Sequence, residues 1–232
     1  MLAVDCGAID YTTALGWQHQ LVRERQADAI DDVVLTCEHE PVYTAGRHAD
    51  VAGHVLGTRD IPVVRVDRGG DVTYHGPGQL VVYPIVRLRQ PRAVRAYVAA
   101  LAHTCVRTAA DFGVHAQPGR RVGVWVGEDK LAAIGVRVDR GVTSHGLAFN
   151  VHPRLDDFAG IVPCGIPDAG VCSLASLGVD TSMAAVRRQL LGHLARTLDR
   201  PLRPGRCDEL GLVTARRRTR EAGTAAPPVP WP

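Results

Sequence analysis

Residues 122–151 read VGVWVGEDKLAAIGVRVDRGVTSHGLAFNV, and they decide the fold class that we expect for this chain. Three runs rich in Val, Ile, Leu and small residues lie within them, at 122–126, 130–138 and 142–151. Two turn sequences separate these runs, Gly127-Glu128-Asp129 and Asp139-Arg140-Gly141. Short polar turns between apolar runs are typical of strands that follow one another directly in a sheet. The stretch therefore predicts three successive strands.

Other strands and helices are predicted on both sides of this stretch. Apolar runs at 33–37, 62–66 and 80–86 predict three more strands. Three helices are expected: one over 11–27 capped by Asp10, one from Pro91 to Gly113, and one capped by Thr181 or Ser182. Few helices and many strands, without strict alternation, predict an α/β or α+β domain with a mixed sheet flanked by helices. A regular doubly wound fold is disfavoured.

Composition predicts a globular protein of the cytoplasm. The 232 residues are 46% hydrophobic and 22% charged, which is ordinary for a soluble domain, and a net charge of +3 does not indicate binding to nucleic acid. The first thirty residues lack the apolar run of a signal peptide, and no stretch approaches the roughly 20 apolar residues of a membrane span. We expect one domain over 1–212 and a disordered Arg/Pro-rich tail over 213–232.

The use of lysine and cysteine directs attention to two residues. Lys130 is the single lysine among 27 basic side chains, and the others are arginines. A buried lysine can act as an acid or base, whereas arginine cannot, although biased composition would also explain one lysine. The six cysteines form no CxxC pair, so no metal site is expected and most are interpreted as buried thiols. Cys164 is different because it lies between Pro163 and Gly165 in a loop, where a thiol is accessible. It is the candidate nucleophile, with Lys130 as its partner.

A glycine-rich motif is the densest signal for a binding site. Residues 68–79 read RGGDVTYHGPGQ and lie between two predicted strands. Glycine lets a ligand approach the backbone closely, and exposed N–H groups in such a loop can bind an anion or a carbonyl oxygen. No GK[ST] follows, so this is not a Walker loop; the alternative is a long turn. A second motif, EHEPVYTAGR at 38–47, follows a predicted strand, where open sheets place ligands, but His39 alone is more typical of a structural role.

Five motifs taken in order resemble the lipoyl(octanoyl) transferase family over about 11–198. They are EHEPVYTAGR at 38–47, RGGDVTYHGPGQ at 68–79, KLAAIGVRV at 130–138, HGLAFNV at 145–151 and IVPCGI at 161–166. One position departs from the family pattern: Cys172 stands where the family commonly has threonine. It puts a second thiol near the expected site.

The resemblance implies the fold of the biotin and lipoate protein ligase catalytic domain, and an acyltransferase that needs no cofactor. It implies that an octanoyl group passes from acyl carrier protein to a lysine of a lipoyl domain, through a thioester on Cys164 that Lys130 activates. The acceptors would be 2-oxo acid dehydrogenase complexes and the glycine cleavage H protein; no nucleic-acid or membrane partner is implied. The implied substrate contacts are Arg68, Gly69, Gly70, Asp71, Val72, Thr73, Tyr74, His75, Ala133, Ile134, Gly135, Gly146, Leu147 and Ala148.

Several alternatives stay open at the level of sequence. Lys130 could act as a neutral base or hold a thiolate in an ion pair. His75 could position either the acyl carbonyl or the incoming amine, and the oxyanion donors could be backbone N–H groups near Lys130 or Gly76. Rival functions are an ATP-dependent ligase on the same fold, a non-catalytic binding protein and a cysteine hydrolase.

Overall fold

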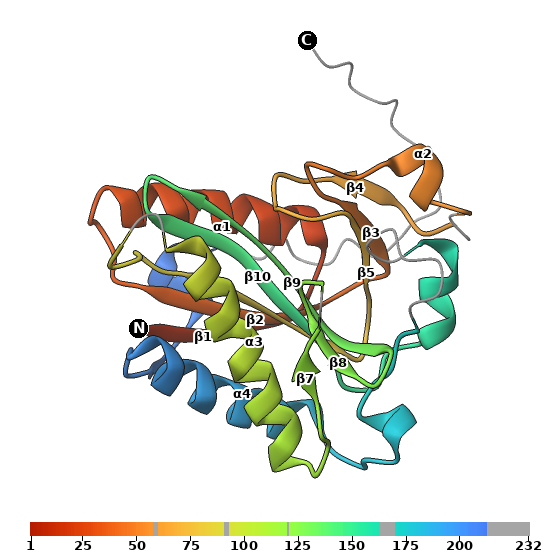
Figure 1. Cartoon of the computed structure of the whole chain (residues 1–232). Helices are drawn as coiled ribbons and strands as arrows, with labels where there is room; N and C mark the ends of the chain where they lie inside the picture. Colours follow the sequence, from red (N-terminus) through yellow and green to blue (C-terminus); the bar gives the residue numbers. More distant parts are fainter. Residues whose placement is uncertain (58–59, 91–92, 120, 163–169, 213–232) are drawn as a thin grey trace.

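The computed structural model describes residues 1–57, 60–90, 93–119, 121–162 and 170–212. An eight-stranded sheet with the order β11-β1-β2-β6-β10-β9-β8-β7 forms the centre of the molecule (Figure 1). Its strands are β1 (Leu2–Ile9), β2 (Val33–His39), β6 (Gln79–Ile85), β7 (Gln117–Pro118), β8 (Val124–Val126), β9 (Asp129–Asp139), β10 (Val142–Asn150) and β11 (Arg203–Gly205). β1 runs parallel to β11 and β2, and the other neighbours are antiparallel. The predicted mixed sheet is confirmed.

The stretch that opened the sequence argument forms the β8–β9–β10 part of this sheet. All three predicted strands are present, but β8 begins at Val124 rather than Val122. Gly123 has a φ of 142°, which interrupts the extended backbone before that strand. The predicted strands at 33–37, 62–66 and 80–86 correspond to β2, β4 (Val63–Arg65) and β6.

A second, three-stranded sheet has the order β4-β3-β5, with β3 at Val42–Ala45 and β5 at Val72–His75. The sequence prediction did not include β3 or β5, and it treated the glycine-rich motif as a loop. The motif instead contains a strand, in which Val72 and Tyr74 bury their side chains in a small core with Tyr43 and Phe158, while Thr73 between them is partly buried. One motif therefore contributes both a loop and a sheet edge.

Helices cover both faces of the large sheet (Figure 1). α1 (Tyr11–Gln26) packs on one face, and α3 (Val94–Asp111) and α4 (Met183–Leu198) pack against each other on the opposite face. The side chains of Asp10 and Ser182 accept hydrogen bonds from the first turns of α1 and α4, so both predicted caps are confirmed. Short elements are α2 (Val51–His54) and the 3-10 helices η1 (Leu155–Gly160), η3 (Ala175–Leu177) and η4 (Cys207–Leu210). The predicted helix start at Pro91 lies outside the described residues.

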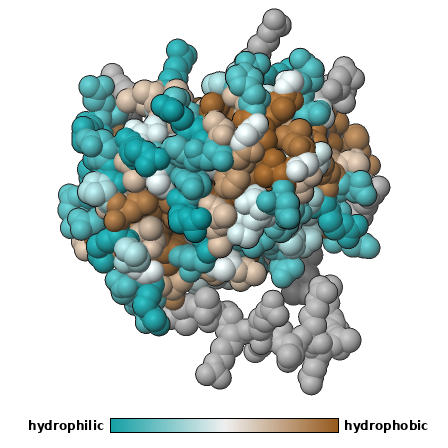
Figure 2. All heavy atoms as spheres, turned by 90° about the horizontal axis from the view of Figure 1, so that it is seen from below, coloured by the Kyte–Doolittle hydropathy of each residue, from teal (hydrophilic) through white to brown (hydrophobic). Residues whose placement is uncertain are grey.

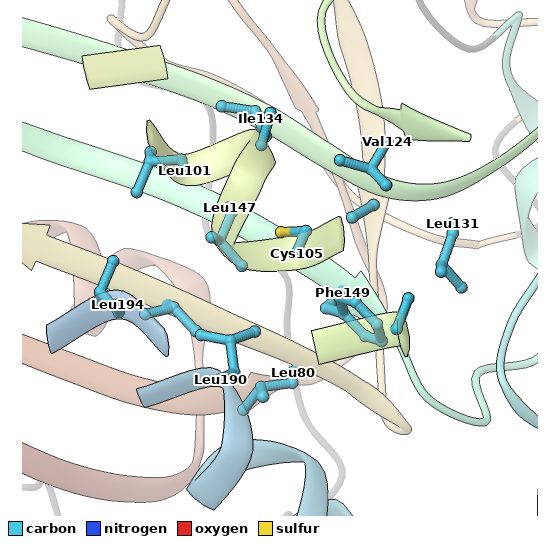
Figure 3. Close-up of a cluster of buried hydrophobic side chains, with 14 of the residues drawn as sticks. Leu80, Leu101, Cys105, Val124, Leu131, Ile134, Leu147, Phe149, Leu190 and Leu194 are labelled. Carbon is cyan, nitrogen blue, oxygen red and sulfur yellow. The ribbon is translucent and has the colours of Figure 1, made fainter. Parts of the chain in front are cut away.

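A cluster of buried apolar side chains fills the core between the sheet and helices α3 and α4 (Figure 3). Leu101 and Cys105 of α3 and Leu190 and Leu194 of α4 are completely buried against it. Burial raises the pKa of Cys105 to about 12, so this thiol serves as a small hydrophobic side chain, as predicted for most of the cysteines. No helix in the described part of the chain is long and apolar enough to cross a membrane.

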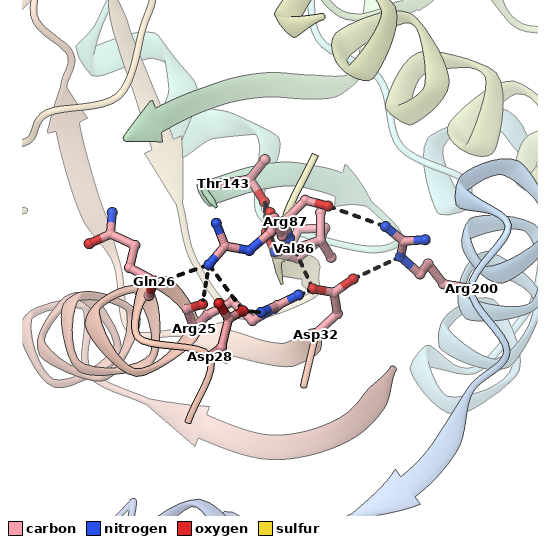
Figure 4. Close-up of polar contacts among 9 residues, drawn as sticks. Arg25, Gln26, Asp28, Asp32, Val86, Arg87, Thr143 and Arg200 are labelled. Carbon is pink, nitrogen blue, oxygen red and sulfur yellow. Dashed lines mark hydrogen bonds and ion pairs between the residues drawn. The ribbon is translucent and has the colours of Figure 1, made fainter. Parts of the chain in front are cut away.

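The buried carboxylate of Asp32 joins three segments that lie far apart in the chain (Figure 4). Asp32 Oδ1 accepts hydrogen bonds from Arg25 Nε at 2.7 Å and the Arg87 N–H at 2.9 Å, and Oδ2 accepts from Arg200 Nε at 2.7 Å. Burial alone would raise the pKa of Asp32, but these three donors outweigh it and lower the pKa. The carboxylate thus ties the ends of α1, β6 and α4 together.

Candidate functional site

A cavity of about 220 Å³ lies where β9, β10 and the glycine-rich motif meet. All but two of the predicted substrate contacts line it. The motif contributes Arg68, Gly70, Asp71, Val72, Thr73 and His75, β9 contributes Ala133, Ile134 and Gly135, and β10 contributes Gly146, Leu147 and Ala148. The glycine-rich motif thus meets two strands that lie about sixty and seventy residues further along the chain, and each of the three segments forms one wall.

The two exceptions, Gly69 and Tyr74, have other partners. The Gly69 N–H donates to the Val136 carbonyl at 2.9 Å, which fastens the motif to β9. Tyr74 turns away from the cavity, packs on Phe158 and donates its hydroxyl to Asp157 Oδ2 at 2.9 Å. Tyr74 therefore anchors the segment that contains η1.

Close backbone packing explains the glycines around the cavity. Gly70 has a φ of 90°, which favours glycine, and a Cβ on Gly135 would lie 2.9 Å from Cδ of Arg68 and 3.2 Å from the Gly69 carbonyl. The Arg68 guanidinium is buried and donates from Nη2 to the Thr44 carbonyl at 2.7 Å and the Thr44 hydroxyl at 2.9 Å. The 38–47 motif, which contains Thr44, thus fixes Arg68 in place.

Six lining residues were missed by the sequence argument. They are Tyr11, Val81, Tyr83, Arg121, Val122 and His145. His145 lies in the HGLAFNV motif, which was a usable signal, whereas Tyr11 and Tyr83 reach the cavity only because α1 and β6 pack beside it. His145 has a φ of 56°, and its Nε2 lies 2.7 Å from Asp67 Oδ1. That hydrogen bond, with the neighbouring Arg137, holds the pKa of Asp67 well below its usual range.

His39 is buried and hydrogen-bonded at both nitrogens. Its Nδ1 lies 2.8 Å from the Ile9 carbonyl and its Nε2 lies 2.7 Å from the Tyr83 hydroxyl. Because a carbonyl only accepts, Nδ1 carries the proton and the Tyr83 hydroxyl donates to Nε2. Burial lowers the pKa of His39 to about 4, so the ring is neutral. This arrangement supports the wall of the cavity behind Tyr83.

Lys130, the second residue of β9, is only 6% exposed. Its Nζ lies 4.7 Å from the centroid of the Trp125 ring on β8, a distance typical of a cation–π contact. The Lys130 N–H donates to the Gly170 carbonyl at 3.0 Å, and its carbonyl accepts from the Cys172 N–H at 3.1 Å. The residues after the PCGI motif are therefore bonded directly to the strand that carries Lys130.

Of the two cysteines that the sequence brought into question, the structure describes Cys172. Cys164 lies outside the described residues. Cys172 is buried, and burial, with a smaller effect of Asp129, raises its pKa to about 11. A thiol with such a pKa is almost entirely protonated at neutral pH and is a poor nucleophile. In the described part of the chain, no three His, Cys, Asp or Glu side chains form a group that could hold a metal ion.

A second hollow, of about 540 Å³, lies between β1 and α4 and contains none of the predicted site residues. Its lining is mostly apolar and includes Ala3, Val4, Leu191 and Leu202. The underside of the molecule, where α4 lies in Figure 1, carries apolar patches separated by hydrophilic side chains (Figure 2). Because the predicted substrate contacts line the cavity beside β9 and β10 and none of them lines this second hollow, the first cavity is the candidate site.

Comparison with known proteins identifies the family and the fold of the chain. Residues 10–195 match the family model of the lipoyl protein ligase A/B catalytic domain. An octanoyltransferase of Solibacter usitatus (strain Ellin6076) is 46% identical over 206 residues, which cover 86% of this chain and 93% of the relative. Many further relatives at 40–46% identity carry the same name.

Two solved structures show the same fold. A bipartite lipoate protein ligase from Thermoplasma acidophilum, studied with its E2 lipoyl domain, superposes with a TM-score of 0.73 at 19% identity. The match covers 91% of this chain and 89% of that one. The biotin protein ligase of Aquifex aeolicus gives a TM-score of 0.51 at 10% identity, covering 86% and 69%. The predicted ligase-like catalytic fold is confirmed.

Proposed function

This chain belongs to the lipoyl(octanoyl) transferase family, within the lipoyl protein ligase A/B catalytic-domain family, and we propose that it transfers an octanoyl group through a cysteine thioester on Cys164. The relatives support octanoyl transfer in protein lipoylation. The donor in the proposal is octanoyl-acyl carrier protein. The acceptor is a lysine of a lipoyl domain, in 2-oxo acid dehydrogenase complexes or the glycine cleavage H protein, and the reaction takes place in the cytoplasm without a cofactor.

The observation that carries the proposal is the meeting of three motifs at one cavity, next to the strand that holds the single lysine. Ile134, Leu147 and Val81 give the cavity apolar surface suited to an acyl chain. Lys130 lies three residues before the first cavity residue of β9, and its N–H bonds Gly170, which closely follows Cys164 in the chain. In the proposal, Lys130 on β9 is the base and Cys164 is the nucleophile for an acyl chain held in this cavity.

Each half-reaction is an acyl transfer with a balanced set of bonds. First, the Cys164 thiolate attacks the donor thioester, the new C–S bond forms, the C–S bond to the carrier breaks, and the carrier thiolate takes the proton that Lys130 removed from Cys164. Second, the acceptor amine attacks the acyl-enzyme, the C–N bond forms, the C–S bond breaks, and Cys164 regains its thiol. Lys130 takes the thiol proton in the first step and the amine proton in the second, as a neutral base.

The test is intact-protein mass spectrometry after mixing the enzyme with octanoyl-acyl carrier protein. Wild type should gain one octanoyl group that hydroxylamine removes and that passes to a lipoyl domain without ATP. Cys164→Ser should gain none, whereas Cys172→Ser should behave as wild type because that thiol stays protonated. An adduct that persists in Cys164→Ser and disappears in Cys172→Ser would refute the assignment; strict dependence on ATP would favour a ligase instead.

A further inference from the structure

A chain of buried amide side chains connects the cavity to the backbone around Lys130. His75 Nδ1 lies 2.7 Å from Gln79 Oε1, and Gln79 Nε2 donates to Asn150 Oδ1 at 3.0 Å and to the Tyr74 carbonyl at 3.3 Å. Asn150 Nδ2 donates to the Cys172 carbonyl at 3.0 Å and the Lys130 carbonyl at 3.4 Å. Gln79 and Asn150 are 1% and 3% exposed, so water does not compete for these bonds.

The direction of every bond in this chain follows from its end at the two backbone carbonyls. A carbonyl can only accept, so the Asn150 amide nitrogen must face Lys130 and Cys172, and its oxygen must face Gln79. Gln79 must then present its nitrogen to Asn150 and its oxygen to His75, since the reverse orientation would bring oxygen against oxygen. His75 Nδ1 is consequently a donor and carries a proton.

The second ring nitrogen of His75 then carries no proton. Burial, together with the nearby His39, lowers the pKa of His75 to about 3, so the ring is neutral at physiological pH. A neutral ring with its proton on Nδ1 has a lone pair on Nε2. Tyr11 stacks on the ring with 5.8 Å between centroids and 14° between planes, which restricts its rotation. His75 lines the cavity, so it offers an acceptor and no ring donor to a bound group.

We propose that His75 accepts a hydrogen bond through Nε2 from the incoming lysine amine in the second half-reaction, and that Gln79 and Asn150 are positioning residues that impose the required tautomer. This inference rests on the proposed acyl transfer and decides between the two roles open to His75. An acyl carbonyl or its oxyanion needs donors, which this ring does not supply. An amine has N–H bonds to donate, and holding one of them aims its lone pair at the thioester carbon. Lys130 remains the group that takes the proton.

The tautomer can be observed without any substrate. Long-range proton–nitrogen NMR spectra of protein labelled with ¹⁵N-histidine distinguish the two neutral forms, and the His75 signals are assigned by their loss in His75→Asn. We expect the Nδ1–H form in wild type across pH 5–8, and loss of this preference in Gln79→Leu, which removes the acceptor. Protonation of His75 at Nε2 in wild type would overturn the proposal, whatever Gln79→Leu does and whether or not that variant folds.

The role of the acceptor is tested by timing the two half-reactions separately. The amide of His75→Asn can still donate to Gln79 but has no atom at the place of Nε2. Acyl-enzyme formation should stay near the wild-type rate, and transfer from the acyl-enzyme to a lipoyl domain should slow about 10- to 100-fold. His103→Asn, at an exposed position of α3, is the matched control and should leave both rates unchanged.

The outcomes separate this inference from the function on which it rests. Slow transfer with normal acylation, together with the Nδ1–H tautomer, supports it. Equal slowing of both half-reactions, or slowing of acylation alone, refutes the amine contact even if the tautomer is as stated. If wild type forms no acyl-enzyme with the carrier, the proposed function fails and the amine contact fails with it, while the spectrum still decides the tautomer.

Discussion

The side-chain nitrogen Nζ of Lys130 lies 4.7 Å from the centroid of the Trp125 ring, and the two residues are paired across β9 and β8. The strand register fixes the ring beside the amine, and the amine is almost completely buried. The face of the Trp125 indole therefore covers the amine from the neighbouring strand.

The role of Lys130 as a base predicts that Lys130→Arg is inactive although it keeps the charge. A guanidinium can still stack on Trp125, but it cannot accept a proton at neutral pH. Turnover of octanoyl transfer should fall by at least about 100-fold, with an unchanged thermal melt. Arg137→Lys, the reverse exchange on the same strand, serves as the control. Near-normal turnover of Lys130→Arg would rule out proton transfer through this residue.

The Asp32 cluster predicts a pH-dependent contribution to stability. Because the pKa of Asp32 is lowered in the folded state, its stabilising effect is present above the unfolded-state pKa of about 3.9. It is lost as the pH falls through the folded-state value. Asp32→Asn should lower the free energy of unfolding by about 2–3 kcal/mol at pH 7. The difference from wild type should shrink below about pH 4. Urea unfolding at pH 7 and pH 3 measures this.

A surface ion pair provides the control for Asp32. Asp208 pairs with Arg206, but both side chains are largely exposed. Solvent screens such a pair, so Asp208→Asn should change the free energy of unfolding far less than Asp32→Asn does. Equal effects of the two substitutions would show that the three hydrogen bonds donated to Asp32 do not stabilise the fold.

Two glycines should respond in opposite directions to alanine. Gly16 lies on the exposed side of α1 with nothing within 4 Å of an added Cβ, so Gly16→Ala should raise the free energy of unfolding by about 0.5–1 kcal/mol. At Gly146 of β10 the added Cβ would lie 2.2 Å from the Val82 carbonyl oxygen, and Gly146→Ala should cost about 2–3 kcal/mol. Thermal and urea unfolding of both variants measure these changes. An unchanged free energy of unfolding in Gly146→Ala would contradict the close approach of β10 to β6.

The position of Tyr74 predicts a loss of stability without a loss of substrate affinity. Tyr74→Phe removes the hydrogen bond to Asp157 and should lower the free energy of unfolding by about 1–2 kcal/mol. The KM for the acyl donor should stay unchanged, because the ring packs on Phe158 and does not line the cavity. Thr73 lies one residue earlier and lines the cavity, so Thr73→Val should raise the KM for the acyl donor and leave the free energy of unfolding nearly unchanged. A raised KM in Tyr74→Phe would return this residue to the binding site.

Much of the architecture could be read from local patterns. The strands within 122–151 and the caps Asp10 and Ser182 were predictable because turn chemistry, strand propensity and side-chain capping act over a few neighbouring residues. The strands β1, β3, β5, β7 and β11 were not predicted. Most are four residues or fewer, and β11 contains proline, so their pairing depends on partners far along the chain rather than on their own sequence.

The sequence by itself determined the fold class, the family and most of the residues that surround the cavity, since these depend on residue identity and order. Only the tertiary structure decided which of those side chains face the cavity, because strand pleat and register turn Tyr74 away while His75 faces in. It also brought in Tyr11, Tyr83 and His145 from other elements. The direction of the hydrogen bonds from Lys130 to His75 follows from contacts among β5, β6, β9 and β10, which no local pattern encodes.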